Sequence, residues 1–284
     1  MDHVIIRFQV GSLACTVFAD STGLLTENRV ASIFAKDIDQ HGDRVLAAFR
    51  ALPEVPEMSQ NILYVENAGE RILIDAGEGT LVPDQPGKLL EQMHSVGIAP
   101  ETIDRVILTH FHMDHIGGLL NATGNANFPK ARLVVPRPEH DYWLNPSSLI
   151  ALASVDPDRA SLLQHTFNAY ADAGGIVLLD ENAEIMPGIR YVAAFGHTPG
   201  QCGVLIESES ERLLHIADTM HMPLQINLVD ASPKFDVLPD KAIATRRTIV
   251  EQAANDALRI IAYHFPYPGI GHIAANGDRF DWVP

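Results

Sequence analysis

Three histidines and one aspartate lie within six residues near the middle of the chain. His110, His112, Asp114 and His115 directly follow the run RVIL at 105–108 and a single threonine. Side chains two residues apart on an extended segment point the same way, so His110 and His112 can face one ion while Asp114 and His115 serve a neighbouring ion. Imidazole and carboxylate groups without a thiolate suit a borderline divalent cation such as zinc. We therefore predict a metal-binding loop; a surface loop that is merely rich in histidine is the alternative.

Three further candidate ligands each follow a predicted strand. His197 lies in the segment GHTPG, Asp218 ends the apolar run 213–217, and His264 follows the run 260–263. Loops at strand ends are where a rigid scaffold usually presents functional groups. Taken singly, these residues could be a capping histidine, a turn aspartate and a histidine at a bend. Together with the histidine-rich loop they favour a site for two metal ions.

Apolar and β-branched runs predict the strands that position these loops. The predicted strands cover 4–10, 13–19, 61–66, 71–75, 103–109, 133–135, 176–179, 190–195, 203–207, 212–217, 259–263 and, at an edge, 279–283. Helical spacing and capping residues predict helices at 88–96, from 116–119 onward, at 157–173 and at 239–254. Residues 20–60 are less regular. We predict a long loop there with short helical pieces, either functional or a plain surface excursion.

The predicted strands fall into two groups, 4–135 and 176–283, each with helices attached. This pattern predicts an α/β fold in which two mixed β-sheets pack face to face with helices on the outer faces, an αββα sandwich. A doubly wound parallel sheet is the alternative, but the hairpins near both ends count against it. No low-complexity linker interrupts the chain, so we predict a single domain, 1–284.

Composition narrows the choice of partner. Among 284 residues, 46% are hydrophobic and 20% are charged, and the formal net charge is −16. That charge argues against binding to nucleic acid or to an anionic membrane, which both need a positive field. No apolar run approaches the roughly 20 residues that span a membrane. Two distant cysteines exclude a disulfide scaffold, and residues 1–7 lack the features of a signal peptide, so we expect a cytoplasmic protein.

The pattern His110-x-His112-x-Asp114-His115, followed by GHTPG at 196–200, Asp218 and His264, resembles the metallo-β-lactamase superfamily. The resemblance covers nearly the whole chain and implies the αββα fold with two metal ions. It implies that one ion is bound by His110, His112 and His197, the other by Asp114, His115 and His264, and that Asp218 bridges them. Asp75, in the segment DAG, resembles the aspartate that orients a ligand histidine without binding metal; a turn role is the alternative.

The segment HFPYPGIGHI at 264–273 is similar to the branch of methyl parathion hydrolase-like organophosphate hydrolases and related acyl-homoserine-lactone lactonases. Residues 11–17 with Asp20, and the later residues Gln225, Asp236 and Arg246, also agree with that branch. The branch places the last ligand before Phe-Pro, which favours His264 over His272. His272 would then line the pocket or hold the loop. The branch also suggests a homodimer.

These features predict a hydrolase with two divalent metal ions, expected to be zinc, in which a metal-bridging hydroxide attacks a small-molecule lactone or related ester. Asp114 and Asp218 are the predicted catalytic residues, with Asp114 also a candidate proton shuttle. Met220 and Met222 flank the site and are candidate pocket residues. The alternatives are an organophosphate or aryl phosphotriester hydrolase, another hydrolase of this fold acting on a thioester or β-lactam, and a metal-binding scaffold without turnover.

Overall fold

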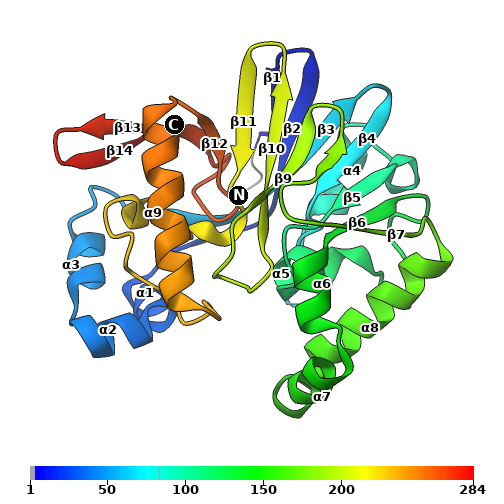
Figure 1. Ribbon diagram of the computed structural model, residues 1–284, viewed down its shortest axis with the longest axis horizontal. Coiled ribbons are helices and arrows are strands. Elements are labelled where there is room, and N and C mark those ends of the chain that lie inside the picture. Colours follow the sequence, from blue (N-terminus) through cyan, green and yellow to red (C-terminus); the bar gives the residue numbers. More distant parts are fainter. Residues whose placement is uncertain (1–3, 83) are drawn as a thin grey trace.

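Two seven-stranded β-sheets form the centre of the molecule (Figure 1). The computed structural model describes residues 4–82 and 84–284. Residues 1–3, part of the segment in which we expect no signal peptide, lie outside the described residues. The first sheet consists, from edge to edge, of β1 (Ile6–Val10), β2 (Leu13–Leu24), β3 (Glu57–Asn67), β4 (Glu70–Ile74), β5 (Arg105–Ile107), β6 (Arg132–Pro136) and β7 (Ile176–Leu179). The second consists of β14 (Arg279–Val283), β13 (Ile270–Asn276), β12 (Arg259–Ile261), β11 (Glu211–His215), β10 (Cys202–Ser208), β9 (Ile189–Ala193) and β8 (Glu184–Met186).

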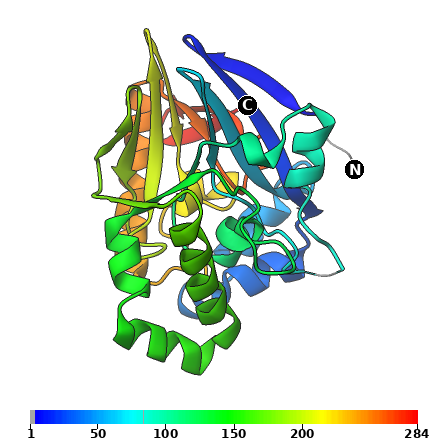
Figure 2. The same ribbon diagram turned by 90° about the vertical axis from the view of Figure 1, so that its right-hand side faces the viewer.

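The two sheets pack face to face, and Figure 2 shows them as two layers. Alternating side chains of both sheets meet in one apolar cluster that includes Val17, Leu63, Val204, Ile206 and Leu213, all fully buried. Because side chains alternate between the faces of a strand, each sheet also needs an apolar cover on its outer face. Burial of this area removes apolar surface from water and is the main force holding the layers together.

Helices supply those outer covers. α4 (Leu89–Ser95) and α8 (Pro157–Asp172) pack on the first sheet through Met93, Leu163 and Tyr170. α9 (Pro239–Asn255) packs on the second sheet through buried residues that include Ile249, Val250 and Ala253. The predicted αββα sandwich of two mixed sheets is therefore confirmed.

The boundary between the two sheets differs from the prediction. Ile176–Leu179 was predicted to belong to the second group of strands, but it is β7 of the first sheet, paired in parallel with β6. Parallel neighbours need a long crossover, and α8 provides it. The division of the strands between residues 135 and 176 was therefore wrong, because β6 and β7 belong to the same sheet although helices separate them in sequence.

Residues 20–60 are more ordered than the predicted long loop. β2 continues to Leu24 and β3 begins at Glu57, which corrects both ends of that range. Between them lie α1 (Glu27–Ile33), α2 (Ala35–His41) and α3 (Arg44–Arg50). These short helices bury their own apolar cluster, which includes Val30, Phe34, Val45 and Phe49. The segment is thus a small helical layer rather than an excursion.

The histidine-rich loop leads into one short helix. α5 (Met113–Ile116) begins inside the loop and ends as a 3₁₀ turn at Gly117–Leu119, whereas we predicted that a helix starts at 116–119. The chain turns here because two glycines lie against the segment after β4. A Cβ at Gly118 would lie 2.0 Å from the carbonyl oxygen of Ala76, and one at Gly117 would lie 2.3 Å from that of Glu78. Only glycine permits this approach.

Two helices and two strands were not predicted: α6 (Arg137–Trp143), α7 (Pro146–Val155), β8 and β13. Among the described helices, none combines the length and the hydropathy that a membrane crossing requires.

Candidate dinuclear metal centre

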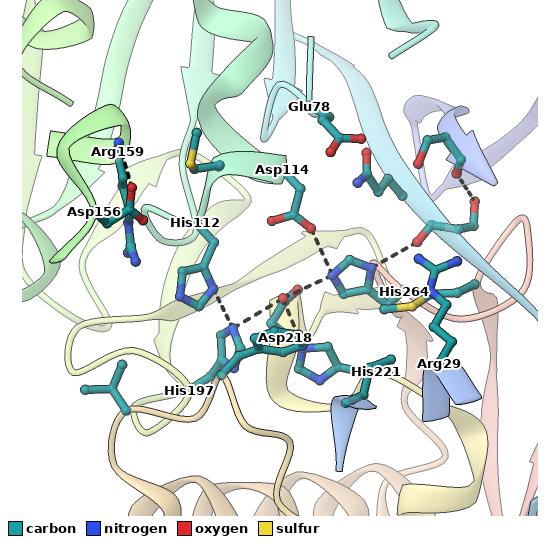
Figure 3. A pocket seen from close by; sticks show the side chains of 18 residues that line it. Arg29, Glu78, His112, Asp114, Asp156, Arg159, His197, Asp218, His221 and His264 are labelled. Atoms are coloured by element: carbon teal, nitrogen blue, oxygen red, sulfur yellow. Dashed lines mark hydrogen bonds and ion pairs between the residues drawn. The ribbon is translucent and has the colours of Figure 1, made fainter. Parts of the chain in front are cut away.

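The seven predicted ligands meet at one end of the sandwich, in loops that follow β5, β9, β11 and β12. Figure 3 labels His112, Asp114, His197, Asp218 and His264 among them. Donor atoms within 4.8 Å of one another form two groups that together contain all seven: His110, His112, His197 and Asp218 in one, and Asp114, His115 and His264 in the other. Residues from distant parts of the chain therefore lie close together, in the same two groups that the resemblance implies.

Asp218 lies between the two groups. Its Oδ2 is 3.4 Å from His197 Nε2 and 3.1 Å from His264 Nε2, and its Oδ1 is 3.2 Å from His115 Nε2. The carboxylate is nearly inaccessible to solvent, while 28% of the Asp114 side chain is exposed to the pocket side. Asp218 is thus placed to contact both groups at once, and Asp114 is the carboxylate that solvent can reach.

Asp75 holds the histidine-rich loop from below. The backbone N–H and the hydroxyl of Thr109 both donate to its carboxylate, each at 2.8 Å, and His115 Nδ1 lies 2.8 Å from its Oδ2. Asp75 is fully buried at the end of β4, with a φ of 62°. Fixing Nδ1 turns the Nε2 atom of His115 toward the centre, the geometry that an orienting carboxylate gives a ligand histidine.

Two further histidines are oriented through Nδ1. His197 Nδ1 lies 2.9 Å from Asp236 Oδ1, and the buried guanidinium of Arg246 donates to Asp236 Oδ2 at 3.2 Å. His264 Nδ1 lies 3.0 Å from the carbonyl oxygen of Ser59. Asp236 and Arg246 entered the sequence analysis only as agreement with a branch, and their contact with His197 appears in the folded chain.

Glu139, which the sequence analysis missed, joins two of the ligand loops. Its carboxylate has no solvent exposure and accepts four hydrogen bonds. Oε1 accepts from Phe111 N–H at 3.0 Å and from the Trp143 indole N–H at 2.7 Å, while Oε2 accepts from the Thr198 hydroxyl at 2.7 Å and from Gly200 N–H at 3.0 Å. Phe111 lies between two predicted ligands and Thr198 follows a third, so Glu139 fixes both sides of the first group.

His221 also belongs to the site, although it was not among the predicted ligands. Its Nε2 lies 3.4 Å from Asp218 Oδ2, its ring stacks on His264 with centroids 5.1 Å apart, and it forms a third donor group with these two residues. It comes three residues after Asp218, which is the only signal the sequence offers.

The charges around the centre favour the metal-binding forms of His110, His112 and Asp218, whereas the neighbouring aspartates favour a protonated His264. Burial lowers the pKa of His110 and of His112 well below the ordinary value, and neighbouring histidines add to this effect, so both rings are neutral. Burial alone would raise the pKa of Asp218, but His264 and His115 outweigh it and hold that pKa well below the ordinary value. Burial would likewise lower the pKa of His264, yet Asp218 and Asp114 raise it to about 9.

The donor set fits divalent metal ions. His115 Nε2 and Asp218 Oδ1 are buried and lie 3.2 Å apart as an ion pair, but neither makes a hydrogen bond to any of the described residues. Buried polar atoms without a partner are rare because each costs free energy. The donor set of five imidazoles and two carboxylates matches the nitrogen and oxygen ligands of zinc. An ion in each group would satisfy the two orphan atoms.

A cavity of about 610 Å³ opens over the centre. Ligand-type residues form its floor, and the walls carry both apolar and charged groups, among them Ile33, Met58, Phe235, Val237, Arg29, Glu78, Asp156 and Arg159. The predicted pocket residues Met220 and Met222 lie instead in two apolar clusters and are absent from the described lining. His272 is exposed on β13, opposite Arg259 and Val283, and is likewise outside that lining.

Known proteins share this architecture. The structure resembles AidC, a dizinc quorum-quenching lactonase solved with its product, with a TM-score of 0.84 and 26% identity over 99% of this chain and 97% of that one. It also resembles the hydrolase AbOPH of the β-lactamase superfamily, with a TM-score of 0.82 and 27% identity over 100% and 98% of the two chains.

Curated sequences match over shorter segments. An N-acyl homoserine lactonase from Bacillus thuringiensis is 23% identical over 177 residues, which is 61% of either protein. A ribonuclease Z from Pyrobaculum arsenaticum is 34% identical over 92 residues, 29% of its length. The chain therefore spans less than two thirds of each of these two relatives.

The family model of the metallo-β-lactamase superfamily matches residues 55–264, a segment that begins just before β3 and ends at the last predicted ligand. That segment contains all seven predicted ligands and strands of both sheets. The chain belongs to the metallo-β-lactamase superfamily.

Proposed function

We propose that this protein is a hydrolase with two divalent metal ions that opens the ring of a lactone, with N-acyl homoserine lactones as its substrate class. The convergence of seven ligand-type side chains carries the proposal, because five of them line the floor of one cavity: His112, Asp114, His197, Asp218 and His264. Similarity to AidC over almost the full length of both chains supports the choice of a lactone.

The two donor groups support a division of the ligands between two ions. His110, His112 and His197 would hold one ion, Asp114, His115 and His264 the other, and Asp218 would contact both, as the resemblance implies. Zinc is the proposed metal because nitrogen and oxygen donors without sulfur suit it and because AidC is a dizinc enzyme.

Bound in these groups, two divalent ions would lower the pKa of water toward neutrality and polarise the carbonyl group of the ester. The protein contributes fixed positions for its donor atoms. Asp75, Asp236 and the Ser59 carbonyl lock the rings of three histidines, so the donor set needs little rearrangement. Preorganised groups of this kind favour the transition state because the cost of ordering them has been met in folding.

Asp114 is the residue best placed to move a proton. It lines the cavity, and its Oδ2 lies 3.3 Å from His264 Nε2. Burial would raise its pKa, but His115 and His264 lower it below the ordinary range, so Asp114 is ionised at neutral pH. Its carboxylate can take a proton released by the attacking water and pass it to the alkoxide oxygen that leaves the acyl carbon. The net reaction adds water across the ring ester and yields a hydroxy acid.

A substrate panel on zinc-loaded protein tests this function. We expect N-hexanoyl homoserine lactone to be hydrolysed with loss of turnover in Asp218→Asn, measured by proton release and by the appearance of the hydroxy acid. An aryl phosphotriester, a thioester and a β-lactam complete the panel. Faster turnover of the phosphotriester than of every lactone would overturn the lactone assignment and favour an organophosphate hydrolase. Zinc-loaded protein that turns over none of them would favour a scaffold.

A further inference from the structure

A partly buried arginine in the cavity wall has no ion partner among the residues that the structure describes. Arg159, on α8, lines the cavity on the side of His112, while Arg29 lies on the side of His264 (Figure 3). Within the residues that the structure describes, no ion pair reaches the Arg159 guanidinium, and its Nε and Nη2 atoms are buried without a hydrogen-bond partner. Asp156, also in the lining, accepts from the Arg159 backbone N–H at 3.1 Å rather than from its side chain.

The Arg159 guanidinium packs on the Trp143 ring rather than pairing with a carboxylate. Its Cζ atom lies 4.1 Å from the centroid of the Trp143 ring, and the Trp143 indole N–H donates to the buried carboxylate of Glu139 at 2.7 Å. Cation–π contact fixes the plane of the guanidinium but leaves its N–H groups unused. The Arg159 guanidinium therefore packs on a ring and still has N–H groups that can donate.

A charged group in this state is costly unless something binds to it. Burial disfavours the charged form of Arg159, and the carboxylates of Glu139, Asp156 and Asp114 oppose that effect only from beyond contact distance. Unpaired buried charges and donors destabilise a folded protein. Elsewhere in the chain a buried arginine is fully used: Arg246 donates to three backbone carbonyls and to Asp236.

We propose that Arg159 binds an oxygen acceptor on the substrate, a carbonyl or a carboxylate, carried on the acyl side away from the bond that is cleaved. The inference rests on the proposed function and makes Arg159 a specificity-determining residue. A substrate whose reacting carbonyl lies over the metal groups would extend past His112 to reach the guanidinium. Guanidinium N–H groups match the oxygen atoms of carbonyl and carboxylate groups, and charge-assisted hydrogen bonds are the stronger kind.

Three γ-lactones separate the possibilities: one with a plain alkyl side chain, N-hexanoyl homoserine lactone with its amide carbonyl, and one whose side chain ends in a carboxylate. Each is assayed with wild-type protein, with Arg159→Met, and with Arg137→Met as the matched control. Arg137 lies on the neighbouring α6 outside the cavity lining and pairs with Asp180 at 2.7 Å.

We expect Arg159→Met to lower kcat/KM about 10- to 100-fold for a lactone with an acceptor, and less than about 3-fold for the alkyl lactone. The lactone whose kcat/KM falls most shows whether Arg159 binds a carbonyl or a carboxylate. Equal losses on all three lactones, or no loss on any, would overturn the proposal.

Binding of ring-opened N-hexanoyl homoserine, followed by calorimetry on zinc-loaded protein, makes the same comparison without turnover. The product retains the amide and gains a carboxylate, so Arg159→Met should weaken its binding while Arg137→Met should not. Wild-type protein inert on all three lactones would contradict the proposed function alone. Unaltered product binding in Arg159→Met would contradict the role of Arg159 alone.

Discussion

At the scale of single residues, the ring nitrogens that face away from the metal groups are held as firmly as those that face them. His110 Nδ1 lies 3.0 Å from the Thr109 hydroxyl, and three other candidate ligands have Asp75, Asp236 or the Ser59 carbonyl at the same position. Outer contacts of this kind set the tautomer and direction of a ligand. In these four cases the site therefore pairs a candidate ligand histidine with a second group that orients its ring.

Glu139 gives the sharpest test of such holding. Glu139→Gln replaces an acceptor oxygen by an amide that must face two donors, so either the loop at Phe111 or the loop at Thr198 loses its bonds. We predict a 10- to 100-fold loss of zinc affinity, measured by competition with a chromophoric chelator. Thr198→Val removes a single donor and should lose less. Wild-type affinity in folded Glu139→Gln would show that Glu139 supports the fold but not the metal groups.

Asp20 predicts a pH dependence of stability. Burial raises its pKa from 3.8 to about 6, although the backbone N–H groups of Glu78 and Leu89 partly oppose this by donating to it. Between about pH 4 and pH 6 the folded chain therefore holds a proton that the unfolded chain has lost, and the free energy of unfolding falls as pH rises through this window.

The corresponding variant is Asp20→Asn, compared with wild type by urea unfolding at pH 4 and pH 7 in the same metal state. The lost titration should change the wild-type-minus-variant difference by up to about 3 kcal/mol, with wild type losing stability at the higher pH. If the amide only weakens a hydrogen bond, the free energy of unfolding of the variant changes by the same amount at both pH values, and its pH dependence is unaffected. An equal difference at pH 4 and pH 7 would show that Asp20 ionises normally in the fold.

The sequence predicts residues best where the information is local. The spacing of His110, His112, Asp114 and His115 states the chemistry within six residues. Glu139 and His221 gave no such signal, because their partners lie on other elements and their roles depend on which loops meet. Met220 and Met222 show the reverse error, since closeness to Asp218 along the chain does not decide which way a side chain points.

At the scale of elements, strands with alternating or continuous apolar runs were predictable, and those defined by their neighbours were not. Ile270–Asn276 is rich in small residues and becomes β13 only through pairing with β12 and β14. α7 lacks a clear apolar face, since Leu152 is its one buried residue. The sequence of α7 therefore carries no clear amphipathic pattern from which a helix could be predicted.

The contact between α5 and the segment after β4 provides a prediction at this scale. In Gly118→Ala the new Cβ would meet the Ala76 carbonyl at 2.0 Å, so the histidine-rich loop has to shift. Such overpacking costs about 1–3 kcal/mol of unfolding free energy, measurable by urea denaturation. Gly23→Ala is the control, because its Cβ would approach only the mobile end of the Arg29 side chain, at 3.2 Å. Equal stability of both variants would show that the loop tolerates the shift.

At the scale of the whole molecule, the αββα sandwich explains why distant residues form one site. Each sheet ends its ligand-bearing strands at the same end of the sandwich, so the loops after β5 and β9 reach the Asp218 that follows β11. The helical layer of residues 27–50 lies beside that end, and Arg29 and Ile33 from α1 complete the cavity wall (Figure 1). The sequence predicted short helical pieces in this segment, and their packing into one layer beside the cavity bears on substrate choice.

The most direct test of two cooperating metal ions is a zinc titration of metal-free protein, with bound zinc and hydrolysis of N-hexanoyl homoserine lactone measured on the same samples. The two donor groups predict saturation at two zinc ions per chain, with most activity appearing as the second ion binds. Full activity at one ion per chain, or two bound ions with no lactone hydrolysis, would contradict a dinuclear lactonase.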